Sequence, residues 1–143
     1  MSAAVPVVLQ GRRVLVVDDE EDSRELIGEI LEEAGAEVRT AGNAERALVE
    51  LAAFDPHVLV CDVSMPGEDG YSLMRRIRAR KPEPGWHVAA AALTAYARDE
   101  DRERALAAGF DLHVTKPIEA VAFALAIAAL ADRPRTNGAV TLT

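Results

Sequence analysis

Short apolar runs rich in β-branched residues alternate along this chain with longer segments of helical period. No other feature constrains the fold as strongly, because this alternation is typical of βαβ units in a parallel sheet. The apolar runs are Val14–Val17, Val38–Ala41, Val58–Cys61, Val88–Leu93 and Leu112–Thr115. The fourth is the least typical strand, because its alanines favour helix by intrinsic propensity. We expect an α/β fold, a doubly wound sheet of five parallel strands with a helix after each strand.

Polar and glycine residues mark the ends of the first three expected helices. Gly35 follows the first apolar helical face and is a plausible end for that helix. Asn43 can cap the second helix, which ends before Asp55. The third helix is expected from near Gly70 through Ile77, and the Pro- and Gly-rich segment 81–85 breaks it.

The last two expected helices differ in character. The fourth is highly charged from Arg98 to Arg104 and ends at Gly109, so we expect most of its surface to be exposed. The fifth runs to about Leu130, with Pro117 expected in its first turn, where a missing N–H does no harm.

Length and charge limit the classes of function. A chain of 143 residues is long enough for one domain, and we expect an N-terminal extension or linker at 1–11, a folded domain at 12–131 and a flexible tail at 132–143. The net charge of −8 argues against direct nucleic-acid binding. No apolar segment is long enough to contact a membrane as a span, and nothing at the start resembles a signal peptide, so a cytoplasmic location is expected.

Polar residues follow four of the expected strands at the point where each strand ends. Asp18 and Asp19 follow the first strand, Asp62 the third, Thr94 the fourth and Lys116 the fifth. Ligands of open parallel sheets bind outside the carboxyl ends of the strands. We therefore expect these side chains to form one site.

Three neighbouring carboxylates repel one another, so their approach calls for a cation. Oxygen ligands favour Mg²⁺ or Mn²⁺. Such a metal, beside a lysine ammonium and a threonine hydroxyl, is suited to phosphoryl transfer, and Asp62 is the best placed nucleophile because an aspartyl phosphate is a known covalent intermediate.

Each of these motifs also has an ordinary structural interpretation when taken alone. Asp18 and Asp19 can complement a helix dipole, Thr94 can cap a helix, and Lys116 can be a surface lysine. Cys61 lies within an apolar run and is expected to be a structural core residue. The coincidence of the polar residues at one sheet edge is what favours the functional interpretation.

Four motifs in this order resemble the receiver domains of two-component response regulators. They are Val-Val-Asp-Asp-Glu at 16–20, Cys-Asp-Val-Ser-Met-Pro-Gly-Glu-Asp-Gly at 61–70, Leu-Thr-Ala at 93–95 and Ala-Gly-Phe-Asp-Leu-His-Val-Thr-Lys-Pro at 108–117. The resemblance covers about Arg12 to Leu130. It implies a flavodoxin-like (βα)5 fold with strand order 2-1-3-4-5.

The resemblance also implies a role for each site residue. Asp62 would accept a phosphoryl group from a histidine of a kinase or a histidine phosphotransfer protein. Asp18, Asp19, Asp62 and the Ser64 main-chain carbonyl would hold Mg²⁺, and Lys116 would pair with phosphoryl oxygens. Thr94 and His113 would form the switch that reports phosphorylation, although the family more often has Tyr or Phe at the His113 position.

The same resemblance implies a signalling switch rather than a conventional enzyme, one that catalyses its own phosphorylation and dephosphorylation. It would act on a downstream effector, either as a free-standing receiver or as the C-terminal receiver of a hybrid histidine kinase; whether it forms a homodimer is left open. The main alternative is a receiver-like interaction module that works without phosphorylation. A nucleotide- or flavin-binding protein lacks its Gly-rich loop here, and a phosphohydrolase of dehalogenase type would need an aspartate where Ser64 stands.

Overall fold

The computed structural model describes residues 4–80 and 86–133, in which strands and helices alternate throughout. The elements are β1 (Arg13–Val17), α1 (Glu21–Glu33), β2 (Glu37–Ala41), α2 (Ala44–Phe54), β3 (Val58–Asp62), α3 (Gly70–Arg78), β4 (Ala89–Thr94), α4 (Asp99–Ala108), β5 (Leu112–Thr115) and α5 (Ala120–Ala131). None of the helices in these two stretches has both the length and the apolar character needed to cross a bilayer.

The strands form one sheet in the order β2-β1-β3-β4-β5, and every neighbouring pair is parallel. The expected doubly wound fold and its strand order are therefore confirmed. From β1 the chain adds β2 on one side and then β3, β4 and β5 on the other, so the order of addition changes direction between β1 and β3. These two strands are neighbours in the sheet, with Val17 opposite Cys61. This is the position at which parallel sheets of this kind bind ligands.

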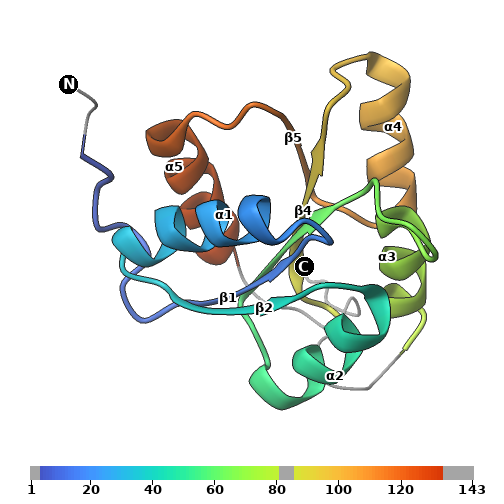
Figure 1. Ribbon diagram of the computed structural model, residues 1–143, viewed down its shortest axis with the longest axis horizontal. Helices are drawn as coiled ribbons and strands as arrows, with labels where there is room; N and C mark the ends of the chain where they lie inside the picture. The colour runs from blue at the N-terminus through green and yellow to red at the C-terminus, as the bar shows by residue number, and fades with distance from the viewer. Residues whose placement is uncertain (1–3, 81–85, 134–143) are drawn as a thin grey trace, which may run out of the picture.

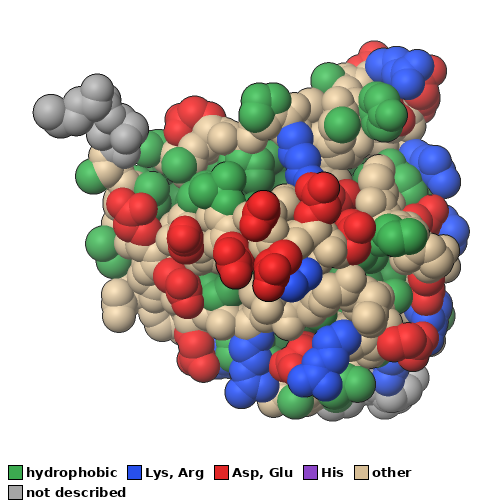
Figure 2. All heavy atoms as spheres, in the orientation of Figure 1, with side chains coloured by type: hydrophobic (Ala, Val, Ile, Leu, Met, Phe, Trp, Pro, Cys, Tyr) green, Lys and Arg blue, Asp and Glu red, His purple; other side chains and the backbone are tan. Residues whose placement is uncertain are grey.

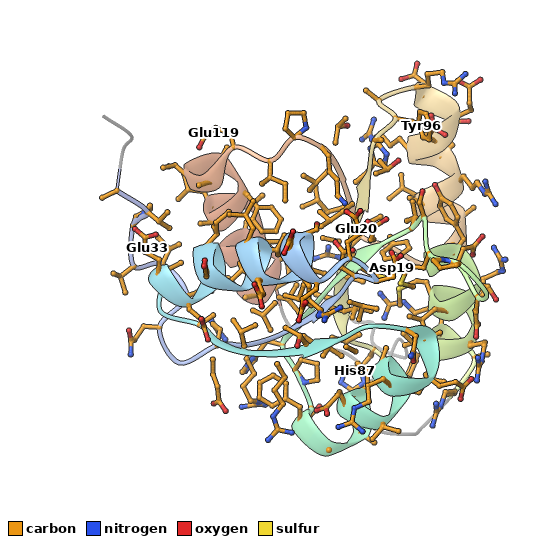
Figure 3. The ribbon with its side chains drawn as sticks, viewed as in Figure 1. Asp19, Glu20, Glu33, His87, Tyr96 and Glu119 are labelled. Carbon is orange, nitrogen blue, oxygen red and sulfur yellow. The ribbon has the colours of Figure 1, made fainter. Side chains whose placement is uncertain are left out.

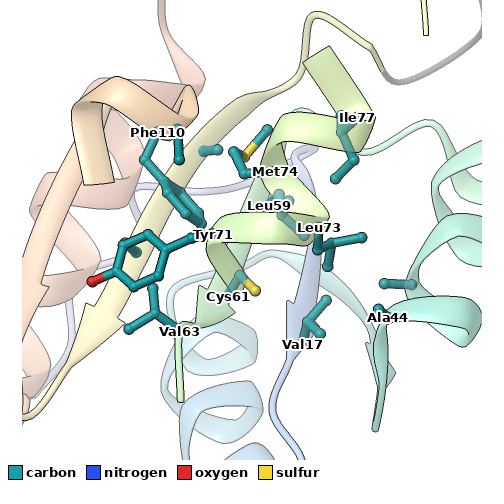
Figure 4. Packing of buried hydrophobic residues seen from close by; sticks show 14 of the residues in the cluster. Val17, Ala44, Leu59, Cys61, Val63, Tyr71, Leu73, Met74, Ile77 and Phe110 are labelled. Atoms are coloured by element: carbon teal, nitrogen blue, oxygen red, sulfur yellow. The ribbon is translucent and has the colours of Figure 1, made fainter. Parts of the chain in front are cut away.

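Helices cover both faces of the sheet (Figure 1). Alternate residues of each strand point to opposite faces, so β1 contributes Leu15 and Val17 to one core and Val14 and Val16 to the other. The first core packs against α2, α3 and α4, and Figure 4 shows part of it around α3. The second packs against α1 and α5. Burial on both faces explains why the strands are almost continuously apolar.

The sequence predicted a strand in the alanine-rich fourth run, and β4 confirms it, one residue later than expected at each end. Ala90, Ala91 and Ala92 are fully buried, and β4 pairs with β3 on one side and β5 on the other. Tertiary burial therefore overrides the helical propensity of alanine here.

Side-chain caps define where three helices begin. The Asn43 side chain accepts a hydrogen bond from the Arg46 N–H, as expected, and Asp69 caps α3 in the same way. Glu119 accepts from the N–H groups of the first turn of α5, which therefore begins at Ala120. The prediction that Pro117 lies in the first turn was wrong, because the cap fixes the helix start three residues later.

The fourth helix matches its prediction closely. Among its residues only Ala105 and Ala108 are buried, so most of its surface is exposed. It ends at Gly109, whose φ of 115° lies in the left-handed region that favours glycine.

The segment before β1 packs against the fold. Leu9 is fully buried, Val5 is also buried, and the Leu9 N–H donates to the Ala34 carbonyl at 2.8 Å. Arg12 forms an ion pair with Asp132 at 2.7 Å, which joins the start of the sheet to the end of α5. The domain boundaries at 11/12 and 131/132 stay predictions. The expected helix-breaking segment 81–85 and most of the expected tail lie outside the described residues.

A half-buried arginine, Arg78, lies at the amino edge of the sheet, where the strands begin. The Arg78 guanidinium donates to the carbonyls of Trp86, Val88 and Gly109 at 3.0, 2.6 and 2.9 Å. It also donates to Asp111 Oδ2 at 3.2 Å. These contacts join the end of α3 to the segments that lead into β4 and β5.

Asp111 completes this cluster. Its Oδ2 atom also accepts the Ala90 N–H at 2.9 Å, and Arg133 Nη1 lies 3.6 Å from its Oδ1 atom. Burial lowers the pKa of the Arg78 guanidinium, and the charge of Asp111 opposes that shift. We refer to Arg78, Asp111 and Arg133 as the amino-edge cluster.

Candidate functional site

The carboxyl ends of four strands bring the predicted site residues together. Asp62 and Thr94 are the last residues of β3 and β4, Asp18 directly follows β1, and Lys116 directly follows β5. Carboxylate oxygens of Asp18, Asp19 and Asp62 all lie within 4.8 Å of one another. We refer to these three acids and Lys116 as the carboxylate site.

Asp62 occupies the centre of the carboxylate site and is only 8% exposed. Its Oδ2 atom accepts a hydrogen bond from Lys116 Nζ at 2.7 Å. Its Oδ1 atom accepts the Ser64 N–H at 2.8 Å, an interaction that the turn after the strand makes possible. The carboxylate is therefore held at both oxygens.

Gly70 allows the first turn of α3 to pack closely against the backbone after Asp62. A Cβ atom at Gly70 would lie 2.7 Å from Val63 Cα and 2.8 Å from the Asp62 carbonyl oxygen, so only glycine fits. The Gly70 N–H also donates to the Val63 carbonyl at 3.1 Å. The first turn of α3 thus presses directly on the backbone that carries Asp62.

Asp18 is the most buried of the three acids, with no exposed surface. Its Oδ1 atom accepts the Glu20 N–H at 3.0 Å, and its Oδ2 atom accepts the Ser23 hydroxyl at 2.6 Å. Arg24 donates to the Asp18 main-chain carbonyl at 2.8 Å. The sequence analysis missed Ser23 and Arg24, although a hydroxyl one helical turn after Asp19 is a signal that could have identified Ser23.

Asp19 is exposed beside these two buried acids (Figure 3), which leaves the site open to solvent on one side. The three carboxylates lie close together and Lys116 pairs with two of them, Asp18 and Asp62, so the carboxylate site carries an excess of two negative charges. All the side-chain ligand atoms are hard oxygens. This donor set fits a divalent cation such as Mg²⁺ or Mn²⁺.

Lys116 is the cation that the protein itself provides. Partial burial lowers its pKa, but the hydrogen bond from Lys116 to Asp62 and the charges of Asp62 and Asp18 outweigh this effect. The net result is a pKa above the ordinary value for lysine. Lys116 therefore keeps its positive charge at neutral pH.

Thr94 lies at the same edge and is 2% exposed. Its hydroxyl oxygen accepts the N–H of Tyr96 at 3.1 Å, and the Tyr96 side chain is exposed. His113 lies on the neighbouring strand opposite Ala92. Its Nε2 atom is buried and has no hydrogen-bond partner among the described residues.

Cys61 precedes Asp62 and points into the core (Figure 4). Burial raises the pKa of its thiol, and the charges of Asp62 and Asp18 raise it further. The thiol therefore stays protonated, which agrees with the structural role expected from the sequence.

The surface around the carboxylate site is acidic. Figure 2 shows Asp and Glu side chains gathered over α1 and the segment before it, where Glu21, Asp22, Glu25, Glu29 and Glu32 are exposed. A hollow of about 490 Å³ lies between α1 and β2, and Arg24 lines it. None of the three carboxylates lines this hollow, so it is separate from the carboxylate site.

Comparison with known proteins gives a consistent assignment. The family model of the response regulator receiver domain matches residues 14–128. An uncharacterized 14.6 kDa protein of Leptolyngbya boryana is 47% identical over 106 residues, which cover 74% of this chain and 79% of that protein.

Longer relatives contain a segment similar to this chain. The hybrid signal transduction histidine kinase D of Dictyostelium discoideum is 30% identical over 91% of the chain, and the sensor histidine kinase RcsC of Salmonella typhi is 33% identical over 88%. The matched segment spans only 9% and 13% of those kinases, respectively.

Solved structures show the same relationship. A putative response regulator from Chloroflexus aurantiacus superposes with a TM-score of 0.79 at 30% identity, covering 85% of this chain and 98% of that one. The signal receiver domain of a histidine kinase from Syntrophus aciditrophicus gives a TM-score of 0.78 at 28% identity, covering 92% and 98%. The chain therefore belongs to the response regulator receiver domain family of two-component signalling and is homologous to the receivers of hybrid histidine kinases.

Proposed function

We propose that Asp62 accepts a phosphoryl group from a phosphohistidine in a reaction that depends on Mg²⁺, and that the modification changes the partner-binding surface of the domain. The observation that carries this proposal is the environment of the Asp62 carboxylate. It ends a central strand, contacts the Lys116 ammonium at 2.7 Å, and lies within 4.8 Å of two other carboxylates. A divalent cation would offset this excess of negative charge and so assist transfer to the acid.

Asp18, Asp19 and Asp62 would hold the metal, with the Ser64 main-chain carbonyl as a further ligand. Receiver domains generally bind Mg²⁺ at an acidic pocket, and the acidic cluster of these three residues supports the same role here. A bound Mg²⁺ would offset the negative charge that three carboxylates and an incoming phosphoryl group bring together. Mn²⁺ suits the same oxygen ligands.

The transfer itself uses a lone pair of the Asp62 carboxylate. An Asp62 oxygen forms a bond to phosphorus while the bond between phosphorus and the donor imidazole nitrogen breaks. The electron pair of that bond stays on the imidazole, which then takes a proton from solvent. Lys116, which stays charged, moves its hydrogen bond from the carboxylate to a phosphoryl oxygen and so stabilises the product.

Thr94 and His113 are proposed as the switch. The Thr94 hydroxyl lies at the end of the strand next to Asp62, and its hydrogen can turn toward a phosphoryl oxygen while its oxygen still accepts the Tyr96 N–H. His113 lies one strand further along the sheet, on β5, and α4, which contacts β5, contributes only two buried residues to the core. A weakly held helix is suited to reporting the modification.

The expected partners follow from the family. A histidine kinase or a histidine phosphotransfer protein supplies the phosphoryl group, and a downstream effector protein reads the phosphorylated surface. The relatives that are hybrid or sensor kinases support a place as one receiver of such a kinase, whereas the match over most of the 14.6 kDa protein supports a free-standing form. The domain would span residues 12–131, act in the cytoplasm and bind no nucleic acid directly.

Phosphorylation can be tested with a small phosphodonor and Mg²⁺. The parent chain should gain one phosphoryl group by intact mass spectrometry, and chelation of the metal should prevent it. Asp62→Asn should gain none, because the amide oxygen is not a competent nucleophile. Asp22→Asn is the matched control, because it removes an exposed acid near the site that contributes no ligand oxygen to the cluster.

Phosphorylation that persisted in Asp62→Asn would contradict the assignment of the acceptor. A parent chain that gained no phosphoryl group would favour a receiver-like module that works without phosphorylation.

A further inference from the structure

We infer that Ser23 is a positioning residue that holds the Asp18 carboxylate in the orientation a divalent cation requires. The inference rests on the metal site of the proposed function. Ser23 is the third residue of α1 and is half-buried. Its hydroxyl donates to Asp18 Oδ2 at 2.6 Å, a short distance typical of a hydrogen bond to a charged acceptor.

Asp18 needs such a partner because no water can reach it easily. The residue has no exposed surface, and a buried carboxylate is stable only when hydrogen bonds satisfy its oxygens. The Glu20 N–H bonds to Oδ1, so the Ser23 hydroxyl is the donor that fixes the other oxygen. Together these two bonds set the rotation of the carboxylate and leave its remaining lone pairs for a metal.

Ser23 also determines how Lys116 is shared between two acids. The ammonium lies 2.7 Å from Asp62 Oδ2 but 3.7 Å from Asp18 Oδ2, the oxygen that Ser23 already satisfies. Without the hydroxyl, Asp18 would turn toward the ammonium and draw it away from Asp62. Ser23 therefore keeps Lys116 on the acid that is proposed to react.

A purely helical role for Ser23 predicts a different result from the positioning role. Alanine is a better helix former than serine, so a residue needed only for the helix would tolerate Ser23→Ala without any effect on metal binding. Residues that orient metal ligands typically change metal affinity by 10- to 100-fold when they are replaced. Metal affinity thus separates the two roles.

The test is calorimetric titration of the 143-residue chain with Mg²⁺ in the absence of a phosphodonor. Ser23→Ala should weaken binding about tenfold or more, whereas Ser23→Thr, which keeps the hydroxyl, should bind nearly as tightly as the parent chain. Ser23→Val has the same shape as Ser23→Thr and lacks only the hydroxyl. Comparing the Mg²⁺ affinities of Ser23→Thr and Ser23→Val therefore isolates the hydroxyl even if Ser23→Ala fails to fold.

The outcomes distinguish this inference from the proposed function. Weak binding by Ser23→Ala and Ser23→Val, with recovery in Ser23→Thr, supports the positioning role. If both variants without the hydroxyl bind Mg²⁺ like the parent chain while Asp18→Asn binds weakly, the metal site stands and the role of Ser23 is overturned. If the parent chain itself binds no Mg²⁺, the proposed metal site is overturned and the role of Ser23 with it.

Discussion

The two edges of the same sheet each hold a cluster of charged side chains, and the two clusters differ in charge balance. At the amino edge, Arg78 donates to three main-chain carbonyls and to Asp111. At the carboxyl edge, three carboxylates lie together with one ammonium, which pairs with Asp62 and Asp18 and leaves the exposed Asp19 without it. The first cluster is satisfied by the protein alone, whereas the second has an excess of negative charge.

This difference shows how one fold separates stability from function. A half-buried charge that finds its partners within the chain ties segments together, as Arg78 does for the end of α3 and the segments before β4 and β5. A group of like charges opposes folding and is retained where a ligand will complete it. Removing a charged side chain should therefore lower stability at the amino edge, whereas removing one of the like charges at the carboxyl edge should raise it.

The largest loss of stability is expected from a substitution at the amino edge. Arg78→Ala would remove one donor from each of three carbonyls and from Asp111, and it should lower the free energy of unfolding by about 2–4 kcal/mol. Urea denaturation measures this loss. Arg75→Ala is the matched control, because Arg75 is exposed on the same helix. Equal stability of the two variants would show that the amino-edge cluster does not hold the fold together.

A smaller loss is expected from Gly70→Ala, which tests whether the backbone supports the carboxyl edge. The new Cβ would press on Val63 and on the Asp62 carbonyl, and overpacking of this kind should cost about 1–3 kcal/mol. It should also reduce phosphorylation, because Asp62 must shift. Gly28→Ala is the control, since its Cβ would meet only Val38 at an ordinary 3.7 Å and should not destabilise α1. A Gly70→Ala variant as stable and reactive as the parent would contradict the close packing.

The smallest change in stability should be a gain, and it is expected from a substitution of Asp19. Asp19→Asn removes one of three mutually repelling carboxylates and should stabilise the metal-free protein by about 0.5 kcal/mol, less at high salt because Asp19 is exposed. The same variant should gain less stability than the parent chain when Mg²⁺ is added. Thermal unfolding in chelator and in Mg²⁺ measures both effects. Destabilisation of the metal-free protein would show that the carboxyl edge is already balanced without a cation.

The sequence allowed prediction of what depends on pattern and spacing. The strand order came from the resemblance to receiver domains, and the Asn43 cap from the preference of asparagine for helix starts. The parallel sheet and the meeting of Asp18, Asp62 and Lys116 follow from the alternation of elements, since parallel strands end at a common edge. The roles of these residues stay predictions.

Contacts between distant segments could not be predicted in the same way. The carbonyl of Gly109 lies 31 residues from Arg78 in the sequence, and a main-chain acceptor carries no residue-type signal. Ser23 was missed because a polar residue in the first turn of a helix is common. The start of α5 was misplaced because Pro117 and Glu119 both favour a helix start, and the side-chain cap determined which one applied.

The ion pair between Arg12 and Asp132 has a consequence for how such a domain can be joined to other proteins. It holds the start of β1 and the end of α5 at one corner, at the edge of the sheet opposite Asp62. A domain whose ends meet can be inserted into a loop of a host protein without stretching either junction. Modules joined at that corner would lie away from the carboxylate site, which would stay accessible in each host protein.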